Sequence, residues 1–288
     1  MSKDKYYYSE RKTKNFIYGL HIELKETRGK YSNLHMYVGN KDNLCLSLSF
    51  HLPTILEDNR FTKEDISIAK LNKIKNLKEC IIEDSSPTNL VNKPSFAKEM
   101  LFDIISFVKQ FEHIKFIRLA DYSNIECDGE SDSLDMLSYY IALHGKSWYE
   151  ANFNSFFLPE KKFIDYRCNV AKYANTETKN KTDWNTIFDR IKISSNEYST
   201  KVFMENEDMY KELYESSKTL PEFFRKITET IPRKNKCTFF KSFFESILNF
   251  YNIDTSRIWF ISLYNVPAKY VAGSYNKKRK PNKTKKKT

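Results

Sequence analysis

The spacing of apolar residues changes along this chain from a period of two to a period of about 3.6. In the segment NLCLSLSFHL (43–52), large apolar residues alternate strictly with smaller ones, which is typical of a β-strand with one buried face. From about residue 186 to residue 252, apolar and aromatic residues recur at helical spacing instead. The two patterns predict an α/β protein, with a mixed sheet flanked by helices and then a mostly helical module.

The first part of the chain predicts neighbouring antiparallel strands. NFIYGLHIEL (15–24) and LHMYVG (34–39) precede the alternating segment, and GNKDN (39–43) is a turn signal between the last two strands. This arrangement predicts a hairpin with one buried face. LKECIIED (77–84) is a short strand candidate, whereas residues 62–78 fit neither pattern.

Two helices enclose a strand in the middle of the chain. The first is predicted to begin at Ser95, a residue type that caps helices well, and its apolar residues keep helical spacing as far as Phe111. IKFIRLAD (114–121) follows as a compact strand, and a second helix is predicted from Leu134 to His144. Further helices are predicted at 219–231 and 237–251, and a closing strand at 256–264.

The segment NKPSFA stands where the first of these helices begins, and Tyr149 in SWYEANF follows the second. This order resembles the N-acetyltransferase (GNAT) superfamily, in which a turn written Q/R-x-x-G-x-G/A binds the pyrophosphate of acetyl-CoA at a helix N-terminus. The matching positions here read N-x-x-S-x-A. The resemblance implies a GNAT-like fold with a cofactor site at Asn92, Ser95, Phe96 and Ala97. It also implies that Tyr149 is the general acid that protonates the leaving thiolate.

A second resemblance lies in the pattern I-x-L-x-D-x-S (117–123) followed by G-K-S-W-Y-E (145–150). This pairing resembles a group of uncharacterised proteins from large DNA viruses, and the low-glycine, Lys- and Asn-rich composition suits them. The resemblances cover the range from about residue 77 to residue 158. They imply a viral protein that acts in the host cytoplasm or in the virion.

The turn departs from the acetyltransferase pattern at several positions. Pro94 lacks a backbone N–H that would hold a phosphate oxygen. Ser95 and Ala97 add side chains where close approach is wanted, although Ala is tolerated at the last position. Asn92 replaces the Gln or Arg of the pattern. We therefore expect a degenerate active site without a cofactor, and the preferred hypothesis is a non-catalytic interaction protein. The alternatives are an active acyl-CoA-dependent N-acetyltransferase that uses acetyl-CoA and Tyr149, and a virion structural or genome-associated protein.

The stretch HGKSWYEANFN follows the second of these helices and permits three interpretations. In the first, Gly145 ends the helix in a left-handed conformation, Trp148 and Tyr149 pack on the aromatic core, and Lys146 stays in solvent. In the second, Lys146 and Ser147 form a turn that binds an anion or a partner. In the third, Tyr149 acts in catalysis, as the acetyltransferase resemblance implies.

Cysteines and histidines give no sign of a metal site. The five cysteines are never spaced as CxxC, and the five histidines supply no paired ligands close in sequence. We expect no metal, and we expect free thiols because the N-terminal residues lack an apolar signal-peptide core. No apolar run reaches about 18 residues, so we expect an intracellular protein without a membrane partner.

Positive charge is concentrated at the C-terminal end. The net charge is +11, but residues 276–288 hold eight cations and no acid, so the other 275 residues carry only +3. Such a segment is expected to be disordered, and to bind phosphates without reading bases. KKRK (277–280) also matches a nuclear-import signal. The cations expected to contact nucleic acid or another polyanion are Lys277, Lys278, Arg279, Lys280, Lys283, Lys285, Lys286 and Lys287.

Aromatic and basic residues also lie together near the N-terminal end. Tyr6–Tyr8 precede Arg11, Lys12 and Lys14, which resembles an aromatic and basic contact for nucleic acid. A paired strand that begins at these tyrosines is an equal alternative. The sequence leaves this choice open.

These patterns divide the chain into four predicted parts. They are a GNAT-like α/β core (1–170), a polar connector (171–185), a mostly helical module with a closing strand (186–265), and a disordered basic tail (266–288). The expected partners are a protein, nucleic acid, or both.

The tail generates the first testable prediction. Deleting residues 276–288 should remove almost all affinity for duplex DNA, because the rest of the chain is only +3. For the full chain, log K should fall with log salt at a slope of about −5, since five or six cations engage phosphates together. Affinity near physiological salt should be on the order of ten micromolar or weaker. Titration of labelled duplex with both proteins at two salt concentrations measures this, and retained binding by the shortened chain would contradict it.

Overall fold

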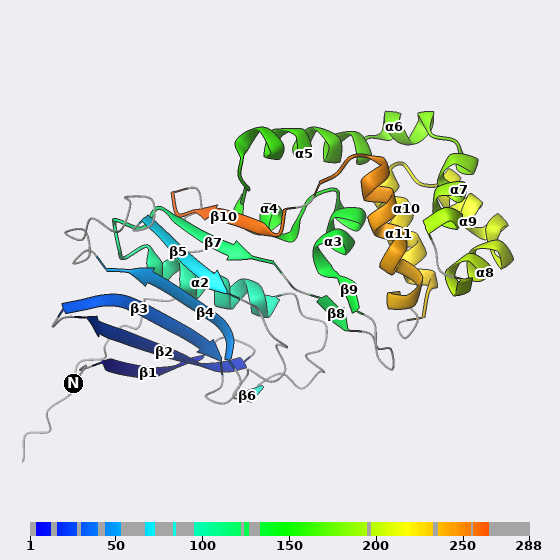
Figure 1. Cartoon of the computed structure of the whole chain (residues 1–288). Helices are drawn as coiled ribbons and strands as arrows, with labels where there is room; N and C mark the ends of the chain where they lie inside the picture. The colour runs from blue at the N-terminus through cyan, green and yellow to red at the C-terminus, as the bar shows by residue number, and fades with distance from the viewer. Residues whose placement is uncertain are drawn as a thin grey trace, which may run out of the picture.

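The computed structural model places the chain in a mixed sheet that is joined to a group of helices (Figure 1). It describes residues 4–12, 16–27, 30–39, 44–52, 67–72, 83–84, 95–121, 124–126, 133–194, 197–232, 236–254 and 256–264. The basic segment 266–288 and residues 92–94 of the expected cofactor turn lie outside these ranges. The predicted α/β class is confirmed.

The main sheet runs in the order β1-β2-β3-β4-β5-β7-β10, and β6 pairs with β2 beside this path. A separate two-stranded sheet is formed by β8 and β9. The strands predicted at 15–24, 34–39 and 43–52 are confirmed, and Tyr6–Tyr8 belong to a paired strand. The strands are β1 (Lys5–Lys12), β2 (Phe16–Thr27), β3 (Lys30–Gly39), β4 (Leu44–His51), β5 (Ile68–Asn72), β6 (Glu83–Asp84), β7 (Phe116–Ala120), β8 (Asn124–Glu126), β9 (Ser133–Asp135) and β10 (Ile258–Ser262).

A parallel crossover lies at the middle of the sheet. β5 and β7 pair in parallel, and α2 (Ser95–Val108) lies between them in the sequence. Parallel neighbours need such a connection because the chain must return to the starting edge. The helix predicted from Ser95 and the strand predicted at 114–121 are therefore both found. β5 falls within residues 62–78, which fit neither pattern. A strand of five residues is too short to establish a period in its apolar residues.

Of the strand predicted at 77–84, only its last two residues lie in the described part. They form β6, which pairs with the start of β2.

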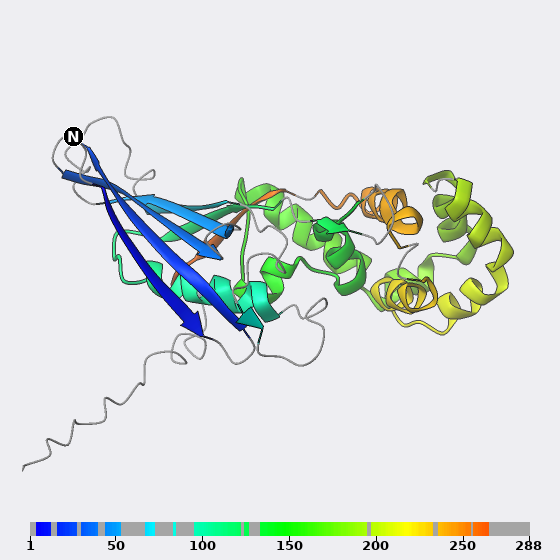
Figure 2. The same ribbon diagram turned by 90° about the horizontal axis from the view of Figure 1, so that it is seen from below.

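One face of the sheet is buried against α2 (Figure 2). Alternate residues of β2, such as Tyr18 and Leu20, are buried on this face. Tyr18 is 1% exposed, and its hydroxyl donates a hydrogen bond to Asp103 of α2. Burial raises the pKa of Tyr18 well above its ordinary value, and the Asp103 carboxylate raises it further. The neutral hydroxyl therefore remains a donor that holds α2 over β2.

The later part of the chain is helical, as the 3.6-residue spacing predicts. The helices predicted at 219–231 and 237–251 are confirmed as α10 and α11. Within the described residues, no helix combines the length and apolar character that crossing a membrane requires. The helices are α3 (Met136–His144), α4 (Trp148–Phe153), α5 (Glu160–Tyr173), α6 (Thr176–Lys181), α7 (Trp184–Ser194), α8 (Glu197–Glu205), α9 (Glu207–Glu215), α10 (Leu220–Thr230) and α11 (Lys236–Phe250).

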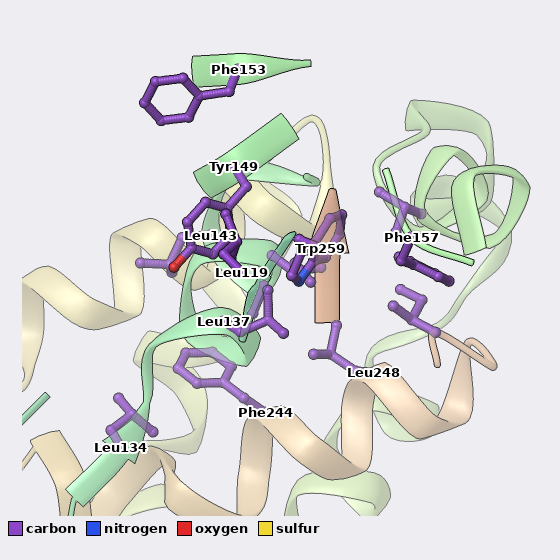
Figure 3. Packing of buried hydrophobic residues seen from close by; sticks show 14 of the residues in the cluster. Leu119, Leu134, Leu137, Leu143, Tyr149, Phe153, Phe157, Phe244, Leu248 and Trp259 are labelled. Atoms are coloured by element: carbon purple, nitrogen blue, oxygen red, sulfur yellow. The ribbon is translucent and has the colours of Figure 1, made fainter. Parts of the chain in front are cut away.

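The helical module and the sheet share one hydrophobic core. On the helical side, Tyr139 of α3 lies against Phe244 of α11, with ring centroids 5.6 Å apart. Figure 3 shows Leu137 of α3 between Phe244 and Trp259 of β10. β10 pairs antiparallel with β7, so Trp259 stands opposite Leu119. The closing strand of the helical module is thus part of the first module's sheet.

Residues 171–185, expected as a polar connector, are helical over most of their length. They include the end of α5, all of α6 and the start of α7. Tyr173 is fully buried, and its hydroxyl donates to the carbonyl oxygen of Ala142 at 2.6 Å. The polar composition therefore belongs to the solvent side of short packed helices.

The cysteines differ in part from the expectation of free thiols. Cys168 on α5 is free and exposed. Cys45 and Cys237 are buried, and each is disulfide-bonded, so the expectation is wrong for these two. Sequence spacing does not reveal such bonds because tertiary contact brings the thiols together.

Leu119 offers a test of the sheet's position in the core. It is 2% exposed on β7, so Leu119→Asp should lower the free energy of unfolding by more than about 3 kcal/mol, because it buries an unpaired charge. Lys115→Asp, at an exposed position just before the same strand, should change it by less than about 0.5 kcal/mol. Urea unfolding of both variants measures the difference. Equal stability of Leu119→Asp and the parent protein would remove Leu119 from the core.

Candidate functional site

In the stretch GKSWYE, residues 145–147 join α3 to α4, and the last three residues form the first turn of α4. Gly145 is the C-cap of α3. Gly145 has φ 63° and ψ 29°, which is the left-handed region, and its N–H donates to the carbonyl oxygen of Ile141 at 2.8 Å. A Cβ at this position would lie 2.8 Å from the Cβ of Ala174. Glycine is therefore required for both its conformation and its size. The predicted end of the helix at Gly145 is confirmed.

The last carbonyl groups of α3 are bound by side chains from other helices. Tyr173 of α5 donates to Ala142, and Arg225 Nη1 of α10 donates to the carbonyl oxygen of Leu143 at 3.2 Å. These groups have no partner within a helix, so external donors satisfy them. The turn is consequently a junction of α3, α5 and α10.

Ser147 and Glu150 form a reciprocal cap at the start of α4. The Glu150 N–H donates to Ser147 Oγ at 3.1 Å, and the Ser147 N–H donates to Glu150 Oε2 at 2.9 Å. Ser147 is fully buried, whereas Lys146 is exposed. The carboxylate that accepts the hydrogen bond from the Ser147 N–H thus belongs to Glu150 of the same turn. Glu150 was missed among the expected site residues, although the S-x-x-E spacing is a signal for this cap.

Glu150 also connects the turn to α5. Tyr166 donates its hydroxyl to Glu150 Oε2 at 2.6 Å, and Arg167 Nη1 lies 3.6 Å from Glu150 Oε1. Burial raises the pKa of Tyr166 well above its ordinary value, and the Glu150 carboxylate raises it further. Tyr166 therefore stays protonated and donates to a carboxylate that is only 8% exposed. This buried polar network stabilises the junction.

Tyr149, the expected catalytic residue, lies in the hydrophobic core. It is 5% exposed and packs between two tryptophans, with ring centroids 5.2 Å from Trp148 and 6.2 Å from Trp259. Figure 3 shows its ring directed toward Leu119 and Leu143. The packing of both aromatic residues of the turn agrees with the first interpretation of this stretch.

The expected cofactor residues lie at and before the start of α2. Asn92 is outside the described part, and α2 begins at Ser95 and Phe96. Ala97 is partly exposed in the first turn of the helix. Ser95, Phe96 and Ala97 thus belong to the helix of the β5–β7 crossover.

Metal ligands do not gather in the part of the chain that the structure describes. Within it, no group of three or more His, Cys, Asp and Glu side chains is placed to hold a metal ion. Residues 127–132, between β8 and β9 in the sequence, include acidic side chains and lie outside the described ranges.

Comparison of the chain with protein-family models, curated proteins and solved structures found no match. The resemblances to acetyltransferases and to viral proteins therefore rest on the sequence patterns alone.

The reciprocal cap predicts a measurable loss of stability. Ser147→Ala removes one cap hydrogen bond and should lower the free energy of unfolding by about 1 kcal/mol. The neighbouring Lys146→Ala is the matched control, and it should have an effect below about 0.5 kcal/mol because Lys146 is exposed. Thermal and urea unfolding measure both. A larger loss for Lys146→Ala than for Ser147→Ala would contradict the cap.

Proposed function

We propose that this chain is a non-catalytic interaction protein on a degenerate N-acetyltransferase-like scaffold. The observation that carries the proposal is the burial of Tyr149 among Trp148, Trp259 and the core leucines. A general acid must reach the leaving atom of its substrate within hydrogen-bonding distance. A tyrosine whose side chain is buried in the core stabilises the fold by packing instead.

The order of elements supports the scaffold part of the proposal. β5, α2 and β7 form a parallel crossover, and α3 then leads through Gly145 to the helix that carries Tyr149. This is the order that the acetyltransferase resemblance implies. Pro94 and Ser95 depart from the pattern at positions that hold a pyrophosphate.

The basic segment 276–288 supplies the interaction part of the proposal. Its eight cations would bind nucleic acid or another polyanion through phosphates, without reading sequence. The rest of the chain is nearly balanced in charge.

Calorimetry with acetyl-CoA tests the loss of catalytic function. We expect no binding tighter than about millimolar, because the backbone cradle for the pyrophosphate is incomplete. Tyr149→Phe keeps the buried ring and should leave this result unchanged. Micromolar binding that Tyr149→Phe or a large residue at Ala97 abolishes would instead support an active acyltransferase.

A further inference from the structure

The sheet face opposite α2 carries its own set of side chains. In Figure 2, α2 lies along one side of the strands, and no described helix lies across the other side of β1 to β4. The strand register places Tyr8, His21 and Tyr37 in one row across β1, β2 and β3. These residues alternate with those that face α2, so they belong to the opposite face, where His21 is only 4% exposed.

Aromatic rings occupy the β1–β2 side of this face. Tyr6 is 59% exposed and Tyr8 is 50% exposed. Both contact His21: the Tyr6 hydroxyl meets His21 Nδ1, and the Tyr8 ring centroid lies 4.8 Å from that of His21. A Cβ at Gly19 would lie 2.8 Å from His21 Nε2 and 2.9 Å from Tyr8 Cε2. The absence of a side chain at Gly19 therefore lets these rings lie close to the sheet.

A second pair of rings continues the surface onto β3. His35 and Tyr37 are stacked, with centroids 6.4 Å apart and an interplanar angle of 13°. Both are partly exposed. Flat, half-exposed rings on a sheet are the surface on which unpaired bases stack.

Two cations lie side by side beyond these rings. Lys70 of β5 stands opposite Arg118 of β7, and Ser49 of β4 stands opposite Lys70. Like charges on directly opposite residues destabilise a sheet. Neither cation has an ion pair in the part of the chain that the structure describes. A bound anion would relieve this repulsion, so the pair points to an anionic ligand.

Acidic residues on the same face lie away from the cation pair. Glu10 and Glu23 are on β1 and β2, and Glu23 Oε2 is 3.9 Å from Lys25 Nζ. From the rings on β3 to Lys70 on β5 the span is two strand spacings, or about 10 Å. The face thus offers stacking surfaces on one side and cations on the other.

We propose that this open face binds a single-stranded nucleic acid. Bases stack on Tyr6, Tyr8 and Tyr37, and phosphates contact Lys70 and Arg118. The site is independent of Tyr149 and of the basic tail. It favours single strands because paired bases do not offer their faces for stacking. The tail accounts for binding to duplex DNA.

Fluorescence polarisation with the full-length chain tests this assignment. The probes are a labelled oligothymidine of about 12 nucleotides and a duplex of equal length. Tyr6→Ala/Tyr8→Ala should weaken single-strand binding about tenfold or more and leave duplex binding unchanged. Tyr6→Phe/Tyr8→Phe retains the rings and should restore single-strand binding. Circular dichroism and melting confirm that each variant is folded.

The cation pair is tested in the same assay. Lys70→Gln/Arg118→Gln should weaken single-strand binding and reduce the magnitude of its salt slope by about 1.4. The matched control is Lys161→Gln/Lys211→Gln, at exposed positions on α5 and α9, which should change neither. Equal losses for both probes, or no loss in the tyrosine variant, would overturn the proposal. Loss with the cation variant alone would indicate a site for polyanions in general, and binding of polyglutamate at this face in place of the oligonucleotide would indicate a protein partner.

Discussion

The packing around Trp259 is the constraint on which the rest of the structure depends. This residue comes from the last described strand, yet it is fully buried beside residues from much earlier in the chain. Its ring centroid lies 5.1 Å from that of Phe157, 6.0 Å from that of Tyr166 and 6.2 Å from that of Tyr149. The sheet, the α3–α4 turn and α5 therefore share one contact region, and the helical module cannot separate from the sheet without exposing it.

This constraint explains why the α3–α4 turn is structural. Gly145 must be left-handed, Ser147 and Glu150 satisfy each other, and Tyr166 holds the Glu150 carboxylate. The polar side chains of Ser147 and Glu150 therefore bond within the protein, and Lys146 alone of the polar turn residues 146, 147 and 150 extends into solvent. A buried network of this kind is stabilising only when it is complete.

The two faces of the sheet differ in the side chains that they carry. The buried side chains that face α2 from β2 to β4 are apolar apart from the hydroxyl of Tyr18, which donates to Asp103. The opposite face holds aromatic rings and the adjacent cations Lys70 and Arg118, which lie outside the hydrophobic core. Alternation along each strand lets one sequence supply both faces.

The sequence by itself determined the features that arise from near neighbours. The alternation in residues 43–52, the helical spacing after Ser95 and the glycine that ends α3 each specify a local backbone conformation. The concentration of charge in residues 276–288 is likewise a property of the sequence alone. The S-x-x-E cap at Ser147 was also readable, because its partners are three residues apart.

Only the tertiary structure decided which distant residues meet. β5 is recognisable through its pairing with β4 and β7, since five residues contain too little periodicity. The burial of Tyr149 depends on β10, more than a hundred positions later in the chain. The Lys70–Arg118 pair and the bonded state of Cys45 and Cys237 depend in the same way on the fold. Local patterns set the conformation of each element, whereas contacts between elements follow from how their apolar faces are buried together.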